Sequence, residues 1–360
     1  MFANLRHRPV RTLLSILAIG VEVTMMLTLV GLSEGMLEDA SRRATGVGAD
    51  ILVRAPGTSL ISLSAAGMSQ TYLSVFSKLP HVKRVAGTVV QPAGGISTVT
   101  GIDLKEFDAM SGGFQYLPGG GPFQGEHDII VDEPYARQNK LSVGSTVNLL
   151  NLDWRVCGVV EPGKLSHVFV DRKVLQDSFG NIGKLSNIYL KLDNPDLADN
   201  VIASMKAQFP GLQIYSMPEL TSLLSVSNVP GLSAFIGVII GLSIVVGFLV
   251  VFLSMYTAVL ERTREVGVLK ALGASPAYIL NIIVRETALL AVAGSVLGII
   301  LTYGSRWAIM TLVPAALTQK IVPGWWPVAG AIAIGGALMG ASYPAWKAAG
   351  QDAIEALSYE

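Results

Sequence analysis

Charged residues, cysteines and histidines are all scarce in this chain of 360 residues. Charged side chains make up 14% of it, against about 25% in an average soluble domain, and the formal net charge is zero. A balanced charge argues against a nucleic-acid partner, because a protein that binds phosphates needs a basic surface. The single cysteine, Cys157, excludes an internal disulfide, and its apolar neighbours favour a packed side chain over a reactive thiol.

The common motifs of enzymes are also missing. The sequence has no G-x-x-x-x-G-K-[ST] and no H-E-x-x-H. Asp103, Glu106 and Asp108 lack the glycine and the final glutamate of a calcium loop. The segment 126–128, Glu-His-Asp, is interpreted as a polar turn before a strand. We therefore expect no catalytic residue, no metal site and no cofactor bound by this chain.

Apolar sequence, in contrast, is abundant, and the mean hydropathy is +0.52. A transmembrane helix needs about 20 apolar residues. Four stretches are long enough: 12–32, 231–260, 287–305 and 321–346. We expect four transmembrane helices with lipid as part of their solvent. Trp325 and Trp326 suit a boundary between membrane and water.

Positive charges in the short segments predict the orientation. They lie in 1–11 (Arg6, Arg8, Arg11), in 261–286 (Arg262, Arg264, Lys270, Arg285) and, as Lys347, in the tail 347–360. Four spans place these three segments on one side, which we expect to be the cytoplasm, and leave the loop 306–320 outside. The first apolar run is too long for a signal peptide and no A-x-A-like site follows it, so we expect an uncleaved span.

The stretch 33–230 is far too long for a loop, so we expect a folded α+β domain outside the cytoplasm. Apolar patterns predict strands at 50–55, 96–102, 128–133, 146–160 and 186–192. They predict helices at 71–79 and 197–209. The first span can continue as a helix to Gly46, and Ser216 with Glu219 forms a capping box. The two ends then form a paired stalk, or else two flexible tethers interrupted at 228–231.

Three pairs of small residues have the spacing that lets membrane helices approach closely. They are Gly237 and Gly241, Gly294 and Gly298, and Gly336 and Gly340. The pairs predict a tightly packed bundle. Contacts within the chain and contacts between two copies both fit the spacing.

Glu22 is the one charged residue inside the first expected span. A carboxyl there costs about 2.5–3.5 kcal/mol on insertion scales, and such residues are candidates for a function. Glu22 could contact another helix, accept a proton or touch a substrate. Alternatively, it is a neutral acid that is hydrogen-bonded to a neighbouring helix. The other expected spans contain no ionisable residue, which argues against transport driven by ions.

The segment 261–275, ERTREVGVLKALGAS, places mixed charge between two uncharged spans. We expect a short amphipathic helix that continues the second span and ends at Gly273. Ser275 can cap the next helix, with Pro276 at its first position. One apolar ridge is expected from Val266, Leu269 and Leu272. Such a helix can fit a groove in a soluble partner. An interfacial helix on lipid is the alternative, which the mixed charge disfavours.

The same segment resembles the signature of FtsX-like and MacB-type ABC transporter permeases. YPAWKAAGQDAIEAL (343–357) resembles the closing segment of that family, with Ala353 where a proline is usual, and GVGADILVRAPG (46–57) resembles its periplasmic core. The resemblance implies a MacB-like periplasmic core between the first two spans, in a protein of the bacterial inner membrane. It also implies mechanotransmission (type VII), in which ATP-driven movement of helices moves the ectodomain.

By this resemblance, the segment is a coupling helix that docks on an ABC ATPase at the cytoplasmic side. Its residues would be Glu261, Arg262, Arg264, Glu265, Val266, Gly267, Leu269, Lys270, Ala271, Leu272 and Gly273. Because the sequence has no P-loop, the ATPase that binds ATP and magnesium is expected to be a separate chain. The resemblance also implies a dimer with a second permease copy or a paralogue, and allows a periplasmic adaptor protein.

The expected function is that of an ABC permease subunit that exports or extracts a drug, peptide, lipid or lipoprotein. The alternative is an FtsX-like regulator that transmits force to an extracytoplasmic partner and transports nothing. An intramembrane enzyme that uses Glu22 is a third class, and it would turn over substrate without an ATPase.

Overall fold

The computed structural model describes residues 9–56, 67–93, 98–223, 232–261, 263–312 and 317–350. The chain forms two compact units. The membrane unit comprises Met1–Glu34, Pro230–Ile309 and Gln319–Glu360, and the ectodomain unit comprises Gly35–Val229 and Met310–Thr318.

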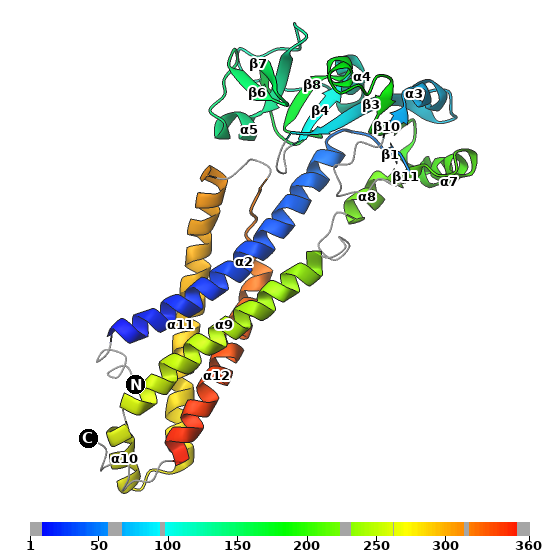
Figure 1. Ribbon diagram of the computed structural model, residues 1–360. Coiled ribbons are helices and arrows are strands. Elements are labelled where there is room, and N and C mark those ends of the chain that lie inside the picture. The colour runs from blue at the N-terminus through cyan, green and yellow to red at the C-terminus, as the bar shows by residue number, and fades with distance from the viewer. Residues whose placement is uncertain are drawn as a thin grey trace. The chain divides into compact units, whose positions relative to one another are not determined.

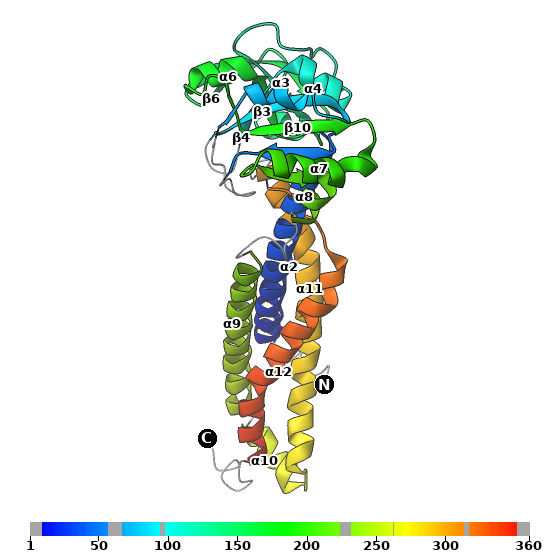
Figure 2. The same ribbon diagram turned by 90° about the vertical axis from the view of Figure 1, so that its right-hand side faces the viewer.

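Among the described residues, four helices are long and apolar enough to cross a membrane. They are α2 (Pro9–Thr45), α9 (Leu232–Glu261), α11 (Pro276–Leu312) and α12 (Trp326–Gly350). Within the membrane unit, α12 runs beside α9 (Figures 1 and 2). A single 3-10 turn, η2 (Pro323–Trp325), precedes α12. The expected set of four membrane helices is therefore confirmed.

Two of the expected glycine pairs bring helices into contact. A Cβ atom added to Gly294 would lie 2.7 Å from the Cβ atom of Ile19 on α2, and one added to Gly298 would lie 2.7 Å from the carbonyl oxygen of Gly20. On α12, a Cβ atom at Gly340 would lie 2.6 Å from the carbonyl oxygen of Phe248 on α9. Its pair mate Gly336 is looser, since its nearest neighbour on α9, Ile244, would be 3.9 Å away.

The third pair behaves differently. A Cβ atom added to Gly237 or Gly241 would meet no atom within 4 Å in the part of the chain that the structure describes. Among the described residues, no other helix packs against these two glycines. A contact between copies stays a prediction.

The ectodomain unit is built on a nine-stranded sheet with the order β11-β1-β10-β3-β4-β8-β5-β7-β6. The strands are β1 (Ile51–Arg54), β3 (Val82–Pro92), β4 (Thr98–Ile102), β5 (Asp128–Asp132), β6 (Thr146–Leu149), β7 (Leu152–Val160), β8 (Val168–Asp171), β10 (Asn187–Leu192) and β11 (Gln213–Ser216). The pairs β4–β8 and β5–β7 are parallel and the other pairs are antiparallel. A separate two-stranded sheet joins β2 (Met68–Ser69) to β9 (Lys184–Leu185).

Both faces of the large sheet are buried, because successive side chains of a strand point to opposite faces. On β5, Ile129 and Val131 belong to one apolar cluster and Ile130 belongs to the other. The helices that complete the two clusters are α3 (Thr71–Phe76), α4 (Leu104–Ser111), α5 (Glu133–Gln138), α6 (Arg172–Ser178), α7 (Ala198–Gln208) and α8 (Met217–Leu223), with the turn η1 (Pro195–Leu197) before α7. Because most strand pairs are antiparallel, the ectodomain is an α+β domain, as expected, with an apolar cluster on each face of the sheet.

Every strand and helix expected for the ectodomain is present, and the sequence patterns missed three strands of the large sheet: β3, β8 and β11. As expected, α2 continues to Thr45, and the Oγ atom of Ser216 accepts a hydrogen bond from the Glu219 N–H at the start of α8. The expected interruption at 228–231 lies outside the described residues. The choice between a stalk and tethers stays open.

Gly298→Ala should destabilise the membrane unit, because its methyl group would overlap the backbone of α2. Overpacking of this kind costs about 1–3 kcal/mol. The thermal midpoint of the purified chain in detergent measures the effect. Gly304→Ala on the same helix is the matched control and should leave the midpoint unchanged or slightly raised, since alanine favours helix and a Cβ atom there meets no described atom within 4 Å. Equal midpoints for the two variants would contradict the packing of α2 against α11.

Candidate functional site

Helix α10 (Thr263–Ala271) occupies the mixed-charge segment, and local sequence signals define its end. Gly273 has a positive φ of 91°, and its N–H donates to the carbonyl oxygen of Lys270 at 2.9 Å. The Oγ atom of Ser275 accepts from the Tyr278 N–H at 3.3 Å, and α11 begins at Pro276. The helix stop at Gly273 and the cap at Ser275 are both as expected.

The segment was expected to continue rigidly from the second span, and the described residues divide it between two helices. Helix α9 ends at Glu261 and α10 begins at Thr263, while Arg262 lies outside the described residues. The two helices point in different directions (Figure 1). The hydroxyl group of Thr263 donates to the carbonyl oxygens of Leu260 at 2.8 Å and Val259 at 3.2 Å, so it connects α10 to the last turn of α9. Glu261 therefore belongs to α9, and the other expected docking residues from Thr263 onward belong to α10 and its C-terminal turn.

One side of α10 is fastened to the rest of the membrane unit. Gly267 is buried, and Val266 packs on the cluster that contains Val259 and Ile283. The Nζ atom of Lys270 donates to the carbonyl oxygen of Ala349, near the C-terminal end of α12, at 2.6 Å. A cation is stabilised there because the last carbonyl groups of a helix carry partial negative charge.

Lys270 was expected on the surface that docks a partner, and the structure instead places its ammonium group against α12. Residues four positions apart share a helix face, so Lys270 follows Val266 to the inner side. The spacing of Val266 and Lys270 therefore indicated that Lys270 faces inward. The sequence did not indicate that its partner is the end of α12. Lys270 anchors α10 inside the membrane unit.

The outer side of α10 is exposed and mixed in character. Arg264 and Glu265 are exposed, as are Val268 and Leu269, and Leu272 in the following turn has 80% of its surface exposed. The expected ridge of Val266, Leu269 and Leu272 does not form a single face. Positions three apart rotate by about 60° relative to one another on a helix, and Leu272 lies beyond the end of α10. The available surface combines apolar side chains with a charge of each sign.

An apolar groove lies beside α10, between α9 and the start of α11. Its lining residues are Met255, Ala258, Val259, Glu265, Val266, Leu269, Ile279, Ile282, Ile283 and Glu286. Glu286 has only 7% of its surface exposed, and the sequence reasoning missed it because the third span was expected to begin at Thr287. The apolar spacing Ile279, Ile283 and Leu290 would have placed Glu286 on the buried face.

Glu22 packs directly on α9. A Cβ atom added to Gly247 would lie 2.0 Å from the Oε2 atom of Glu22, so only glycine leaves room for the carboxyl group. Glu22 has 6% of its surface exposed, and its Oε1 atom has no hydrogen-bond partner in the described structure. Nearby, the Oγ atoms of Ser15 and Ser254 join the same two helices at 2.7 Å. Glu22 therefore contacts a neighbouring helix. Among the described residues, its Oε1 atom does not make the hydrogen bond that was expected for a neutral acid.

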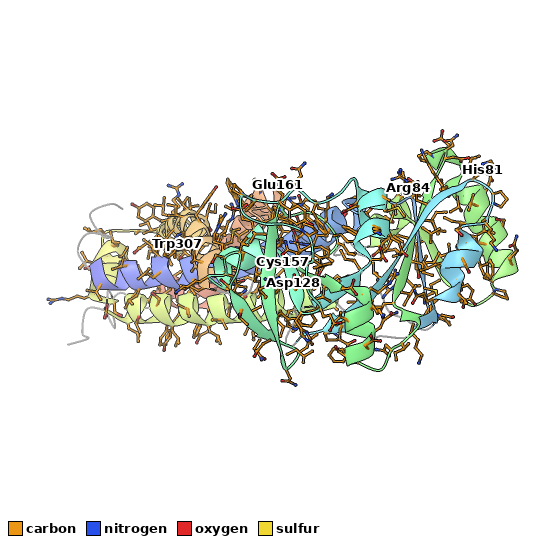
Figure 3. All side chains as sticks on the ribbon, turned by 90° about the horizontal axis from the view of Figure 1, so that it is seen from above. His81, Arg84, Asp128, Cys157, Glu161 and Trp307 are labelled. Atoms are coloured by element: carbon orange, nitrogen blue, oxygen red, sulfur yellow. The ribbon has the colours of Figure 1, made fainter. Side chains whose placement is uncertain are left out.

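The polar residues of the ectodomain that resembled reactive groups have structural partners. The thiol of Cys157 donates to the carbonyl oxygen of Ile129 at 3.2 Å, and burial raises its pKa to about 12. Asp128, which Figure 3 shows beside it, accepts from two backbone N–H groups and pairs with Arg155. Glu126-His127-Asp128 is therefore a turn that Asp128 fixes, and the Cys157 thiol is a poor nucleophile.

Asp103 and Glu106, in the acidic stretch 103–108, likewise have structural partners. Asp103 caps α4 by accepting from the N–H groups of Lys105 and Glu106. Glu106 pairs with the buried Arg172 at 2.6 Å. These carboxylates hold α4 and the start of α6.

Lys270→Met should loosen α10, because the methionine side chain cannot donate to the end of α12. Faster deuterium uptake by the peptide that covers 263–272 is expected, measured by mass spectrometry on the purified chain. Arg264→Met is the control, since it removes a positive charge from the exposed side of the same helix, and its uptake should match the wild type. Unchanged uptake in Lys270→Met would show that the contact with Ala349 does not hold α10.

Two family models match the chain. Residues 12–208 match the MacB-like periplasmic core domain, and residues 237–353 match the FtsX-like permease C-terminal domain. The ABC transporter permease YknZ of Bacillus subtilis, described as uncharacterized, is 30% identical over 228 residues, which cover 60% of this chain and 55% of YknZ. The macrolide export ATP-binding/permease protein MacB of Acinetobacter baylyi is 23% identical over 330 residues, which cover 83% of this chain and 49% of MacB.

Among solved structures, the periplasmic region of MacB from Actinobacillus actinomycetemcomitans is 16% identical, with a TM-score of 0.39, over 50% of this chain and 94% of that one. The chain spans about half the length of the YknZ and MacB proteins it matches. The two family models together cover most of the first membrane helix, most of the ectodomain and most of the remaining membrane helices. The chain belongs to the ABC transporter permeases that combine a MacB-like periplasmic core domain with an FtsX-like permease C-terminal domain.

Proposed function

We propose that this chain is the permease subunit through which a separate ABC ATPase moves an extracytoplasmic domain, and that α10 is the element that docks on the ATPase. The observation that supports this proposal is that α10 has one attached side and one exposed side. Thr263, Val266 and Lys270 fasten one side to α9, α11 and α12, and the other side is exposed. A helix that is attached in this way can receive a push on its outer side and pass it to three membrane helices.

The exposed side suits a protein partner better than lipid. Glu265 and Arg264 offer a charge of each sign, and Leu272 offers an apolar anchor for a pocket on the partner. A helix that binds a lipid surface instead carries an excess of Lys and Arg on its polar face. The ATP and magnesium are bound by the ATPase, outside these 360 residues.

The proposed orientation places α10 in the cytoplasm of a bacterial cell, at the inner membrane. Arg264, Lys270 and Arg285 give this end of the membrane unit its positive charge, as the positive-inside rule requires. Two permease copies, or this chain and a paralogue, would face two ATPase subunits, and Gly237 and Gly241 are available for contact between copies. The work done by the ectodomain would be export or extraction of a drug, peptide, lipid or lipoprotein. The FtsX-like alternative shares the coupling step and differs in acting on an extracytoplasmic partner.

Leu272→Asp should abolish copurification of the ATPase, because it places a charge where an apolar pocket must close. The tagged chain is purified from its native membrane in mild detergent, and the P-loop ATPase is quantified by mass spectrometry. Ile182→Asp is the matched control, since Ile182 is an ectodomain side chain with 73% of its surface exposed. This control should retain the ATPase in full.

The Glu265→Lys variant should still insert into the membrane. Its ectodomain should no longer move when the ATPase hydrolyses ATP. A wild-type chain that carries no ATPase after crosslinking would refute the proposed function. So would an ATPase that still copurifies with Leu272→Asp, together with ectodomain movement that stays coupled to ATP hydrolysis in Glu265→Lys.

A further inference from the structure

The last turn of α2 contains a buried arginine, and all three nitrogen atoms of its guanidinium group have partners. Arg43 has 6% of its surface exposed. Its Nε atom donates to Asp39 at 2.6 Å, its Nη1 atom to the carbonyl oxygen of Ser166 at 3.0 Å, and its Nη2 atom to Asp132 at 3.0 Å. The Nδ1 atom of His167 lies 2.9 Å from Nη2. One side chain of α2 thus contacts the end of β5 and the segment that leads into β8.

Asp132 is the residue that connects this arginine to the sheet. It is 1% exposed and is the last residue of β5. Its Oδ1 atom accepts from the Tyr135 N–H and so caps α5, while Oδ2 faces Arg43 and lies 2.8 Å from the Nδ1 atom of His167. Removal of one partner from such a buried pair leaves an uncompensated charge, which makes the pair hard to break.

The backbone around Arg43 also packs closely against the segment that leads into β8. The carbonyl oxygen of Arg43 accepts from the Leu165 N–H at 2.9 Å. A Cβ atom at Gly46 would lie 1.9 Å from the carbonyl oxygen of Gly163, and Gly48 has a φ of 76°. Val47 between them is completely buried. A helix end is normally the part that frays, because its last carbonyl groups lack partners, and here it is held by side chains and backbone together.

We propose that Arg43 is a positioning residue for force transmission, which locks the end of α2 onto the sheet at β5 and β8. Rotation or axial movement of α2 then reaches the sheet instead of being absorbed by unwinding of the last turn. The inference rests on the proposed function for the source of the movement. The lock itself is a property of the ectodomain unit and can be tested without an ATPase.

The neighbouring arginine provides a matched control. Arg42 has 63% of its side chain exposed and reaches Asp39 only at 3.9 Å. Arg42 and Arg43 share the same helix and the same charge, but they point to opposite surroundings. Arg43→Gln therefore removes a guanidinium group that belongs to the lock, and Arg42→Gln removes one that lies outside it.

The lock is tested by pulsed electron paramagnetic resonance on the full chain in detergent. Two spin labels, at Glu38→Cys on α2 and Lys173→Cys on α6, are introduced into a Cys157→Ser background. Both sites are exposed and lie in the ectodomain unit. One narrow distance peak is expected for the background and for Arg42→Gln. Loss of that narrow peak is expected for Arg43→Gln. A narrow peak that survives Arg43→Gln would overturn the proposal.

Arg43→Lys separates positioning from general stability, because lysine keeps the charge and loses the planar fork that reaches several acceptors. It should fold, and its distance peak should be broader than that of the wild type. If Arg43→Gln does not fold, this variant carries the test, and a peak as narrow as the background would overturn the proposal. In the complex with the ATPase, the Lys173→Cys label of each of the two permease copies reports movement of the ectodomains relative to each other. Arg43→Lys should hydrolyse ATP at the wild-type rate, while this ATP-dependent shift between the copies is reduced. A wild-type complex that shows no such shift would count against the proposed function and not against the lock.

Discussion

The contact between the Lys270 ammonium group and the carbonyl oxygen of Ala349 decides what α10 can do. A short helix of nine residues is marginal by itself in water and needs tertiary contacts to persist. Lys270 supplies one by placing positive charge on the open end of α12, and Val266 adds an apolar contact on the same side. The charged and apolar residues of the opposite side are thereby held outward, in the arrangement that a docking partner requires.

Buried charge is handled in two ways in this protein. In the ectodomain unit, Arg43 pairs with Asp132 and Arg172 pairs with Glu106, so each buried charge has an opposite charge and further hydrogen bonds. In the membrane unit, Glu22 meets the bare backbone of Gly247. The contrast follows from the surroundings, because a folded sheet domain can gather opposite charges from distant strands, whereas the apolar spans offer few polar groups.

Long apolar runs and local capping signals were predictable, since each depends on residues close together in the sequence. The four membrane helices, the stop at Gly273 and the cap at Ser275 are of this kind. Strand β3 was missed because Ala86 and Gly87 interrupt its β-branched residues at the buried centre. Gly87 is tolerated there because a larger side chain would collide with Leu185, which lies almost one hundred residues further along the chain.

The sequence by itself determined that the chain enters a membrane four times, that a large domain separates the first two spans, and that a compact charged helix lies between the second and third. Hydropathy, length and helix periodicity act over short stretches of chain and need no partner. Only the tertiary structure decided that Lys270 turns inward, that Glu22 rests on Gly247, and that Arg43 meets Asp132. Each of these contacts joins residues more than seventy positions apart, and such partners are chosen by the packing of whole elements.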